Sequence, residues 1–176
     1  TMFGIEQWEV EPDIMTMAKA ITNGAQPMGA VAVRDEIYET VVEKGNGGIE
    51  FFHGYTYSGH PLAAAAGCAT LDVYQEEGLF ERARSIEDKF ADALHSLKGE
   101  PNVIDVRNFG LIGAVELAPI EGQPTARAMS VFRECFDNGV IVRTTGDTLA
   151  FSPPLIIEEA QIGTVVDTVR AALRKQ

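Results

Sequence analysis

The chain has 176 residues, of which 45% are hydrophobic and 23% are charged, a composition typical of globular proteins. A chain of this length buries about 70% of its unfolded surface, and no apolar run approaches the roughly 18 residues of a membrane span. A disordered chain, a transmembrane protein and a disulfide-stapled mini-domain are therefore excluded. Fourteen basic against 26 acidic residues give a net charge of −12, which argues against nucleic acid and anionic membranes as partners.

The two cysteines and the first residues bear on the cellular setting. Cys68 and Cys135 both fall inside apolar helical patterns, so we interpret them as reduced core thiols of a cytoplasmic protein. The first residues show neither an initiator pattern nor a signal peptide. We therefore expect the chain to be a piece of something larger.

The first part of the chain predicts short strands and two helices. The expected elements are a buried strand or loop at residues 12–19, a buried strand at 29–33, a helix at 35–42 and a helix at 62–77. Pro61 suits the first turn of the last of these helices, and Gly78 ends it.

The remaining residues predict a second group of elements. Helices are expected at residues 79–97, 126–138 and 158–175, with strands over 103–117 that break at Gly110 and Gly113. The middle helix is expected to bury one face, made of Met129, Phe132, Cys135 and Phe136. This order predicts a compact α+β unit, and hence domains at residues 1–78 and 79–176.

A hairpin is predicted around Gly146 and Asp147, because glycine first in a two-residue loop favours a type II′ turn. In that register Arg143 faces Ala150 across the strands and shares a sheet face with Ile141. One hypothesis is that Arg143 clamps a planar carboxylate, which a guanidinium fits bidentately. The alternative is an ordinary exposed arginine on an acidic protein.

Lys19 lies among apolar neighbours, with Gly24 five residues further on. A lysine in such a setting commonly extends its amine to water. The alternative is a lysine that forms a Schiff base, since such an amine must lose its proton to attack a carbonyl, and desolvation favours that loss.

The segment from His53 to Pro61 is rich in hydroxyl groups and glycine and leads into a predicted helix. One hypothesis is a phosphate site at this helix start. The alternative is a connector in which His60 or Ser58 caps the helix. A metal site at His53 and His60 is a poor interpretation, because the spacing is seven and no third ligand is evident nearby.

Taken together, these segments resemble the class III aminotransferases, which use pyridoxal phosphate (PLP) on the fold-type I α/β scaffold. Within that family the chain is most similar to the omega-amino acid (β-alanine):pyruvate aminotransferases. The motifs, which together span the whole chain, are PDIMTMAKAITNG at 12–24, PMGAV at 27–31, HGYTYSGHP at 53–61, RNFGL at 107–111 and VRTTGDT at 142–148.

The resemblance implies a transaminase that moves an amino group from an omega-amino acid or amine donor to pyruvate. By that resemblance Lys19 is catalytic and holds PLP, Thr56 and the backbone of Tyr55 bind the PLP phosphate, and Arg143 binds the substrate carboxylate. The family's phosphate loop reaches the neighbouring subunit, which implies a homodimer or a dimer of dimers, and no metal is implied. Residues 1–78 would be the C-terminal part of the PLP-binding large domain and residues 79–176 the small α+β domain.

The sequence also departs from the family, since it covers less than half of a full member. It lacks the aspartate that pairs with the pyridine nitrogen, the aromatic residue that stacks on the ring, and the glycine-serine phosphate loop. We therefore expect the isolated chain to be inactive as a transaminase.

Two other hypotheses stay open. The first keeps the fold and changes the reaction, to an aminomutase or to an aminotransferase for 4-aminobutyrate or acetylornithine. The second is an α+β module without a cofactor, which binds a partner or serves assembly. The threonines, glycine and aspartate that follow Arg143 favour the pyruvate group.

Overall fold

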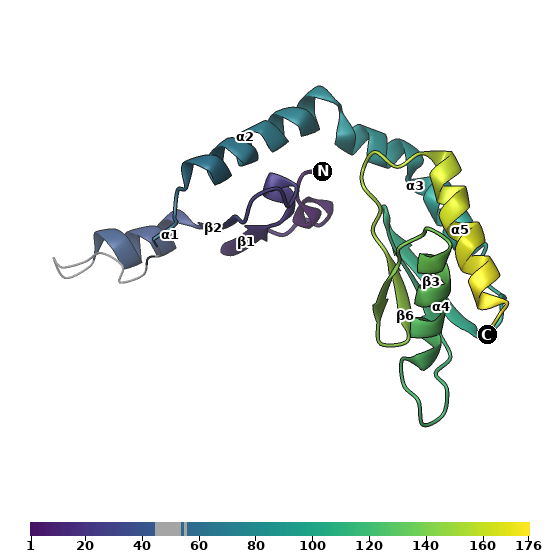
Figure 1. Cartoon of the computed structure of the whole chain (residues 1–176). Helices are drawn as coiled ribbons and strands as arrows, with labels where there is room; N and C mark the ends of the chain where they lie inside the picture. Colours follow the sequence, from purple (N-terminus) through teal and green to yellow (C-terminus); the bar gives the residue numbers. More distant parts are fainter. Residues whose placement is uncertain (45–53, 55) are drawn as a thin grey trace. The chain divides into compact units, whose positions relative to one another are not determined.

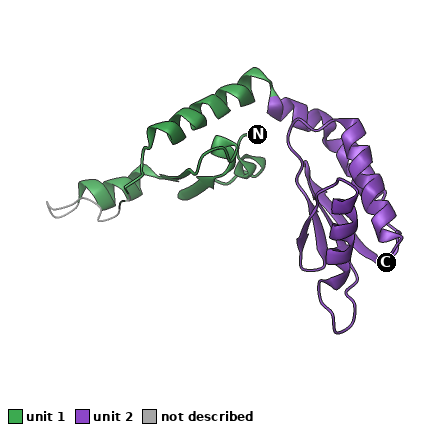
Figure 2. Cartoon of the chain, viewed as in Figure 1, with its two compact units in different colours: residues 1–78 green, residues 79–176 purple. Residues whose placement is uncertain are grey.

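A computed structural model of the chain describes residues 1–44, 54 and 56–176 (Figure 1). The chain forms two compact units, Thr1–Gly78 and Leu79–Gln176 (Figure 2). No helix in these residues is both long enough and apolar enough to cross a membrane.

The first unit is built from a two-stranded sheet, short helical turns and one long helix. Its elements are the 3-10 turn η1 (Gly4–Gln7), β1 (Ile14–Ala18), the 3-10 turn η2 (Ala20–Thr22), β2 (Gly29–Val33), α1 (Asp35–Tyr38), the π-helical η3 (Glu39–Glu43) and α2 (Pro61–Glu76). Strands β1 and β2 run antiparallel, from the pair Ile14 and Val33 to the pair Ala18 and Gly29. Helix α2 packs on η2, the turn that follows β1.

Two expectations about burial in this unit are wrong. Strands β1 and β2 exist, but both are largely exposed: Ile14 is 55% and Val31 60% exposed. Cys68 is likewise an exposed thiol on α2, not a core residue. The reason in both cases is that the described residues of this unit add no further strand to the sheet and bury only part of α2.

The second unit has a closed core. Its elements are α3 (Leu79–His95), β3 (Val103–Phe109), β4 (Ile112–Leu117), α4 (Ala126–Asp137), β5 (Arg143–Thr145), β6 (Thr148–Phe151) and α5 (Glu159–Leu173). The strands form an antiparallel sheet in the order β3-β4-β6-β5. Helices α3 and α4 pack on the sheet, and α5 packs on both of these helices. The side chains between these layers form one apolar cluster that includes the fully buried Leu94, Val115 and Leu149.

Two details of this unit differ from expectation. Gly110 does turn the chain between β3 and β4, but Gly113 lies inside β4, paired with Asn108 and Phe151. A Cβ atom on Gly113 would lie 2.3 Å from Leu94 Cδ2, so glycine is needed here for the close approach of α3 and not for a turn.

The buried face of α4 was expected correctly at Cys135 but wrongly at Phe136. It consists of Ala128, Val131 and Cys135, with Phe132 partly buried against the core, whereas Phe136 is 57% exposed. Burial raises the pKa of the Cys135 thiol to about 11, as for a structural, unreactive cysteine.

Candidate active site

The turn after β1 holds Lys19 in an unusual backbone conformation. Its φ of 58° and ψ of −79° lie outside the regions that non-glycine residues favour, close to the rare γ-turn. Its carbonyl accepts hydrogen bonds from the backbone N–H groups of Thr22 at 3.1 Å and Gly24 at 2.9 Å. Conformations of this kind cost about 1–3 kcal/mol, persist only where the surroundings enforce them, and cluster at functional sites.

The side chain of Lys19 is exposed, and within the described part of the chain it makes no hydrogen bond or ion pair. The desolvation expected from its apolar neighbours is therefore not supplied by these residues. An amine without a carboxylate partner is nevertheless available to attack a carbonyl carbon once it has lost its proton.

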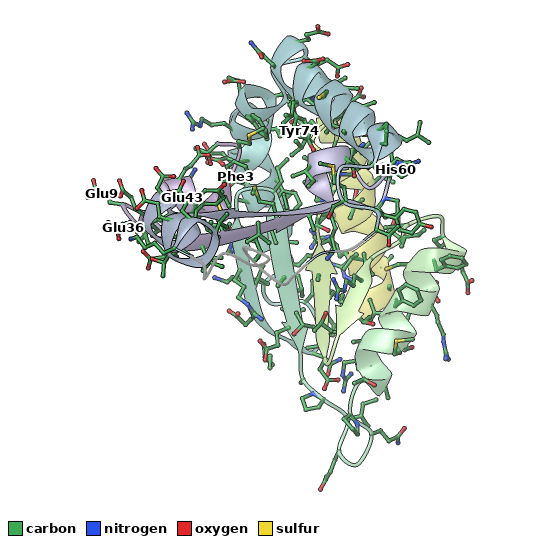
Figure 3. All side chains as sticks on the ribbon, turned by 90° about the vertical axis from the view of Figure 1, so that its left-hand side faces the viewer. Phe3, Glu9, Glu36, Glu43, His60 and Tyr74 are labelled. Carbon is green, nitrogen blue, oxygen red and sulfur yellow. The ribbon has the colours of Figure 1, made fainter. Side chains whose placement is uncertain are left out.

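The expected phosphate loop is only partly within the described residues. His53 and Tyr55 lie outside them, whereas Thr56 is described and is exposed, in a turn five residues before α2. His60 is the N-cap of α2: its Nδ1 accepts the backbone N–H of Leu62 at 3.2 Å. This is the capping role considered for His60, and Figure 3 shows this residue at the start of the helix, with Tyr74 further along it.

Arg143 lies on the hairpin in the register expected from the sequence. It pairs with Ala150, and Thr145 pairs with Thr148. Gly146 has a φ of 60°, and Asp147 does not share its positive φ, as in a type II′ turn. Ile141 and Arg143 are exposed while Val142 between them is buried, so Arg143 lies on the sheet face that α3 and α4 leave open.

A second arginine lies on the same row of this open face. Cross-strand pairing runs from Arg107 through Ala114 and Ala150 to Arg143. Arg107 Nη1 donates to Asp105 at 2.6 Å and to Glu116 at 2.8 Å. The hydrogen bond from Arg107 holds the pKa of Asp105 below its usual value, and the same two carboxylates raise the pKa of Arg107.

The Arg143 side chain differs from that of Arg107, because it makes no hydrogen bond or ion pair with any residue that the structure describes. The residue also borders a hollow of about 350 Å³ whose lining is mostly apolar and includes the core residues Leu94 and Phe151. A few polar groups on an otherwise apolar wall are typical of small-molecule sites. The arrangement suits a free cation that binds an incoming carboxylate.

Lys19 and Thr56 thus belong to the first unit and Arg143 to the second. Sequence reasoning did not single out Thr22, Tyr74 or the carboxylates around Arg107. For the carboxylates a signal was present, since alternation along predicted strands places Asp105 and Arg107 on one face. Thr22 carried no such signal, because its burial depends on the path of the following turn.

Comparison with known proteins places these residues in a family. The family model described as aminotransferase class-III matches residues 1–173. An omega-aminotransferase of Caulobacter vibrioides is 52% identical over 97% of the chain, and a beta-alanine–pyruvate aminotransferase of Pseudomonas aeruginosa is 42% identical over 98%. The chain spans about 39% of the length of each of these relatives.

Solved structures agree with the sequence comparison. A thermostable omega transaminase variant from Pseudomonas jessenii matches 99% of the chain with a TM-score of 0.93 at 31% identity, over 40% of its own length. A Bacillus anthracis aminotransferase matches 99% with a TM-score of 0.89 at 34% identity, over 41% of its own length. The expected α/β aminotransferase fold is confirmed, and the chain belongs to the class III aminotransferase family.

Proposed function

We propose that the protein, at its full native length, is a PLP-dependent transaminase that transfers an amino group from an omega-amino acid such as β-alanine to pyruvate. The family supports the reaction class, and the names of two relatives, beta-alanine–pyruvate and omega-amino acid–pyruvate aminotransferase, support the substrates. A putrescine–pyruvate aminotransferase is also similar, at 36% identity, so the donor class extends to amines without a carboxylate.

The observation that carries this proposal is Lys19: an exposed amine without a partner among the described residues, on a backbone held in a strained conformation. Its Nζ would hold the cofactor by a covalent link to the aldehyde carbon, formed with loss of water. Once the substrate amine has displaced it, the free Nζ would take a proton from the substrate carbon and deliver it to that cofactor carbon. When bound, PLP supplies an electron-withdrawing ring that stabilises negative charge on that carbon. The exposed primary amine fits this group.

Thr56 and the backbone of Tyr55 bind the phosphate of the cofactor in this proposal. A hydroxyl group and a backbone N–H are both donors that phosphate oxygens accept. Thr56 fits, because its side chain is exposed and precedes α2 by a short turn. As the family's loop serves the neighbouring subunit, we further propose a cytoplasmic homodimer.

Arg143 binds the carboxylate of pyruvate or of an amino-acid donor. Its guanidinium has no competing acid among the described residues, so it is free to form a charge-assisted, bidentate pair with an incoming carboxylate. For a donor without a carboxylate at that place, the long side chain has the freedom to move aside.

The two units correspond in this proposal to the C-terminal part of the PLP-binding large domain and to the small domain. Exposed apolar residues of the first unit, such as Ile14 and Val31, are then covered by parts of the enzyme that the relatives contain beyond the matched region. The 176-residue chain alone is expected to lack turnover.

The test is transamination of β-alanine and pyruvate by the protein at its full native length, compared with Lys19→Ala. Lys98→Ala is the matched control, since the Lys98 side chain is also exposed and makes no hydrogen bond or ion pair within the described residues. We expect Lys19→Ala to abolish turnover and Lys98→Ala to leave it unchanged. Borohydride reduction of the PLP-bound protein should place the phosphopyridoxyl label on Lys19. A label on another lysine, or turnover by Lys19→Ala, would refute the assignment.

A further inference from the structure

Thr22 is the buried polar residue of the described chain, with only 1% of its surface exposed. Its hydroxyl donates to the carbonyl of Gln26 at 2.7 Å and lies 3.4 Å from the carbonyl of Lys19. A hydroxyl has one proton, so the shorter contact with Gln26 is the stronger hydrogen bond. The hydroxyl therefore links the middle of the turn to its end at Gln26, while also contacting the Lys19 carbonyl at its start.

Two backbone hydrogen bonds to the carbonyl of Lys19 close the same turn. The N–H groups of Thr22 and Gly24 both donate to it, and Gly24 supplies a φ of 71°, which glycine adopts at little cost. If the turn opened, these two bonds would be lost and Lys19 would relax from its strained φ of 58°. The buried Thr22 hydroxyl opposes that opening, because its bond to Gln26 persists only while the turn is closed.

Helix α2 contacts Ala20, the residue that follows Lys19 in the turn. The Tyr74 hydroxyl donates to the carbonyl of Ala20 at 2.9 Å. About two helical turns before Tyr74, a Cβ atom on the buried Gly67 would lie 3.4 Å from Met28 Sδ and 3.5 Å from the carbonyl of Ile21. A direct hydrogen bond and a close backbone approach therefore fix the turn against α2.

We propose that Thr22 is a positioning residue for Lys19, supported by Tyr74: together they hold the lysine backbone so that its Nζ meets the cofactor aldehyde at a fixed angle. The inference rests on the proposed role of Lys19. The physical reason is that a lysine side chain has several rotatable bonds, and fixing its backbone removes one source of misorientation. Small errors in the placement of a reacting group lower rates steeply.

The test compares Thr22→Val, which removes the hydroxyl but keeps the shape, with Thr22→Ser, which keeps a hydroxyl. Thr168→Val is the matched control, because the Thr168 hydroxyl also donates to a backbone carbonyl, that of Thr164 at 2.7 Å, but within α5 of the second unit. All three are made in the protein at its full native length. The readouts are the rate of PLP incorporation at Lys19, trapped by borohydride and located by mass spectrometry, and the visible circular dichroism of the bound cofactor, which reports its orientation.

We expect Thr22→Val to slow incorporation at Lys19 about tenfold, as the loss of one buried hydrogen bond implies, and to change the visible dichroism per bound cofactor. Thr22→Ser should restore both readouts to within about twofold of the unsubstituted protein by the same reasoning, and Thr168→Val should leave them unchanged. Should Thr22→Val fail to fold, Tyr74→Phe takes its place, with the same change in dichroism expected.

Two outcomes separate the failure of this inference from the failure of the proposed function. If the unsubstituted protein is labelled at Lys19 and the Thr22→Val or Tyr74→Phe protein behaves identically in both readouts, Thr22 has no positioning role and the function stands. If the unsubstituted protein is not labelled at Lys19 at all, both the proposed function and the inference are wrong.

Discussion

Arg107 and Arg143 occupy one cross-strand row of the same sheet face, and their surroundings give them different roles. Two alanines separate them, and Arg107 is neutralised by Asp105 and Glu116 while Arg143 has no acid partner in the described chain. An arginine bound to two carboxylates has little affinity left for a third. Of the two, Arg143 is therefore the one to which we assign the proposed binding of the substrate carboxylate.

In the protein at its full native length, Arg143→Ala should lower kcat/KM for pyruvate by about 10- to 100-fold. This factor corresponds to the loss of a charged hydrogen bond of about 1.5–3 kcal/mol. An aldehyde acceptor has no carboxylate, so its kcat/KM should stay unchanged. Steady-state kinetics with both acceptors measure the difference. Arg133→Ala, at an exposed arginine on α4, is the control for loss of one positive charge. An equal loss of kcat/KM for pyruvate and for the aldehyde would show that Arg143 does not bind the carboxylate.

At the scale of elements, the packing of α3 on β4 depends on one glycine. Leu94 and Phe90 of α3 approach Gly113 so closely that a Cβ atom there would lie 2.3 Å from Leu94 Cδ2 and 3.3 Å from the Phe90 ring. Both side chains are buried in the core, so a Cβ atom at Gly113 would force at least Leu94 to shift from its packed position. Gly163 on α5 is the opposite case, because nothing lies within 4 Å of the atom that alanine would add.

Gly113→Ala should lower the free energy of unfolding of the second unit by about 1–3 kcal/mol, the usual cost of overpacking a core. Gly163→Ala, the same chemical change within a helix, should raise it by up to about 1 kcal/mol through helix propensity. Urea denaturation followed by circular dichroism measures both. If Gly113→Ala were neutral, the contact between α3 and β4 would be looser than described.

At the scale of the whole molecule, the charges that hold the second unit together connect segments far apart in the chain. The Glu100 carboxylate, after α3, accepts hydrogen bonds from Arg170 at 2.7 Å and from two nitrogens of Arg174 at 2.8 Å, both on the last helical segment. The bonds from Arg174 and then Arg170 lower the pKa of Glu100 from 4.5 to about 2. The ionised carboxylate is therefore favoured by folding.

This depressed pKa predicts how stability depends on pH. The contribution of Glu100 to the free energy of unfolding is fully present above pH 4.5, its ordinary pKa, and is lost as pH falls toward about 2. Glu100→Gln should be less stable than the unsubstituted chain at neutral pH, and the difference should shrink between pH 4.5 and 2. Urea denaturation over this range tests it, with Glu121→Gln in an exposed loop as control. A difference that stays constant with pH would contradict the assignment.

The sequence by itself determined the family, the strand and helix order and the hairpin register. These are local properties: Gly146 and Asp147 select the turn type, and the turn then aligns Arg143 with Ala150. Pro61 and Gly78 likewise mark the limits of α2. Motif spacing was sufficient for the family, because five segments in one order are far more specific than any one of them.

The tertiary structure alone decided what each residue contacts. Burial of β1, β2 and Cys68 was expected from apolar pattern, yet a pattern only says that a face can be covered, and in the described residues these faces are exposed. Thr22 looked ordinary in the sequence, because its hydroxyl gains importance only when the turn brings Gln26 within 2.7 Å of it. Gly113 was expected to break a strand, whereas the structure shows that glycine is needed there because α3 packs directly against it. In each case the deciding interaction joins residues whose proximity is created by folding.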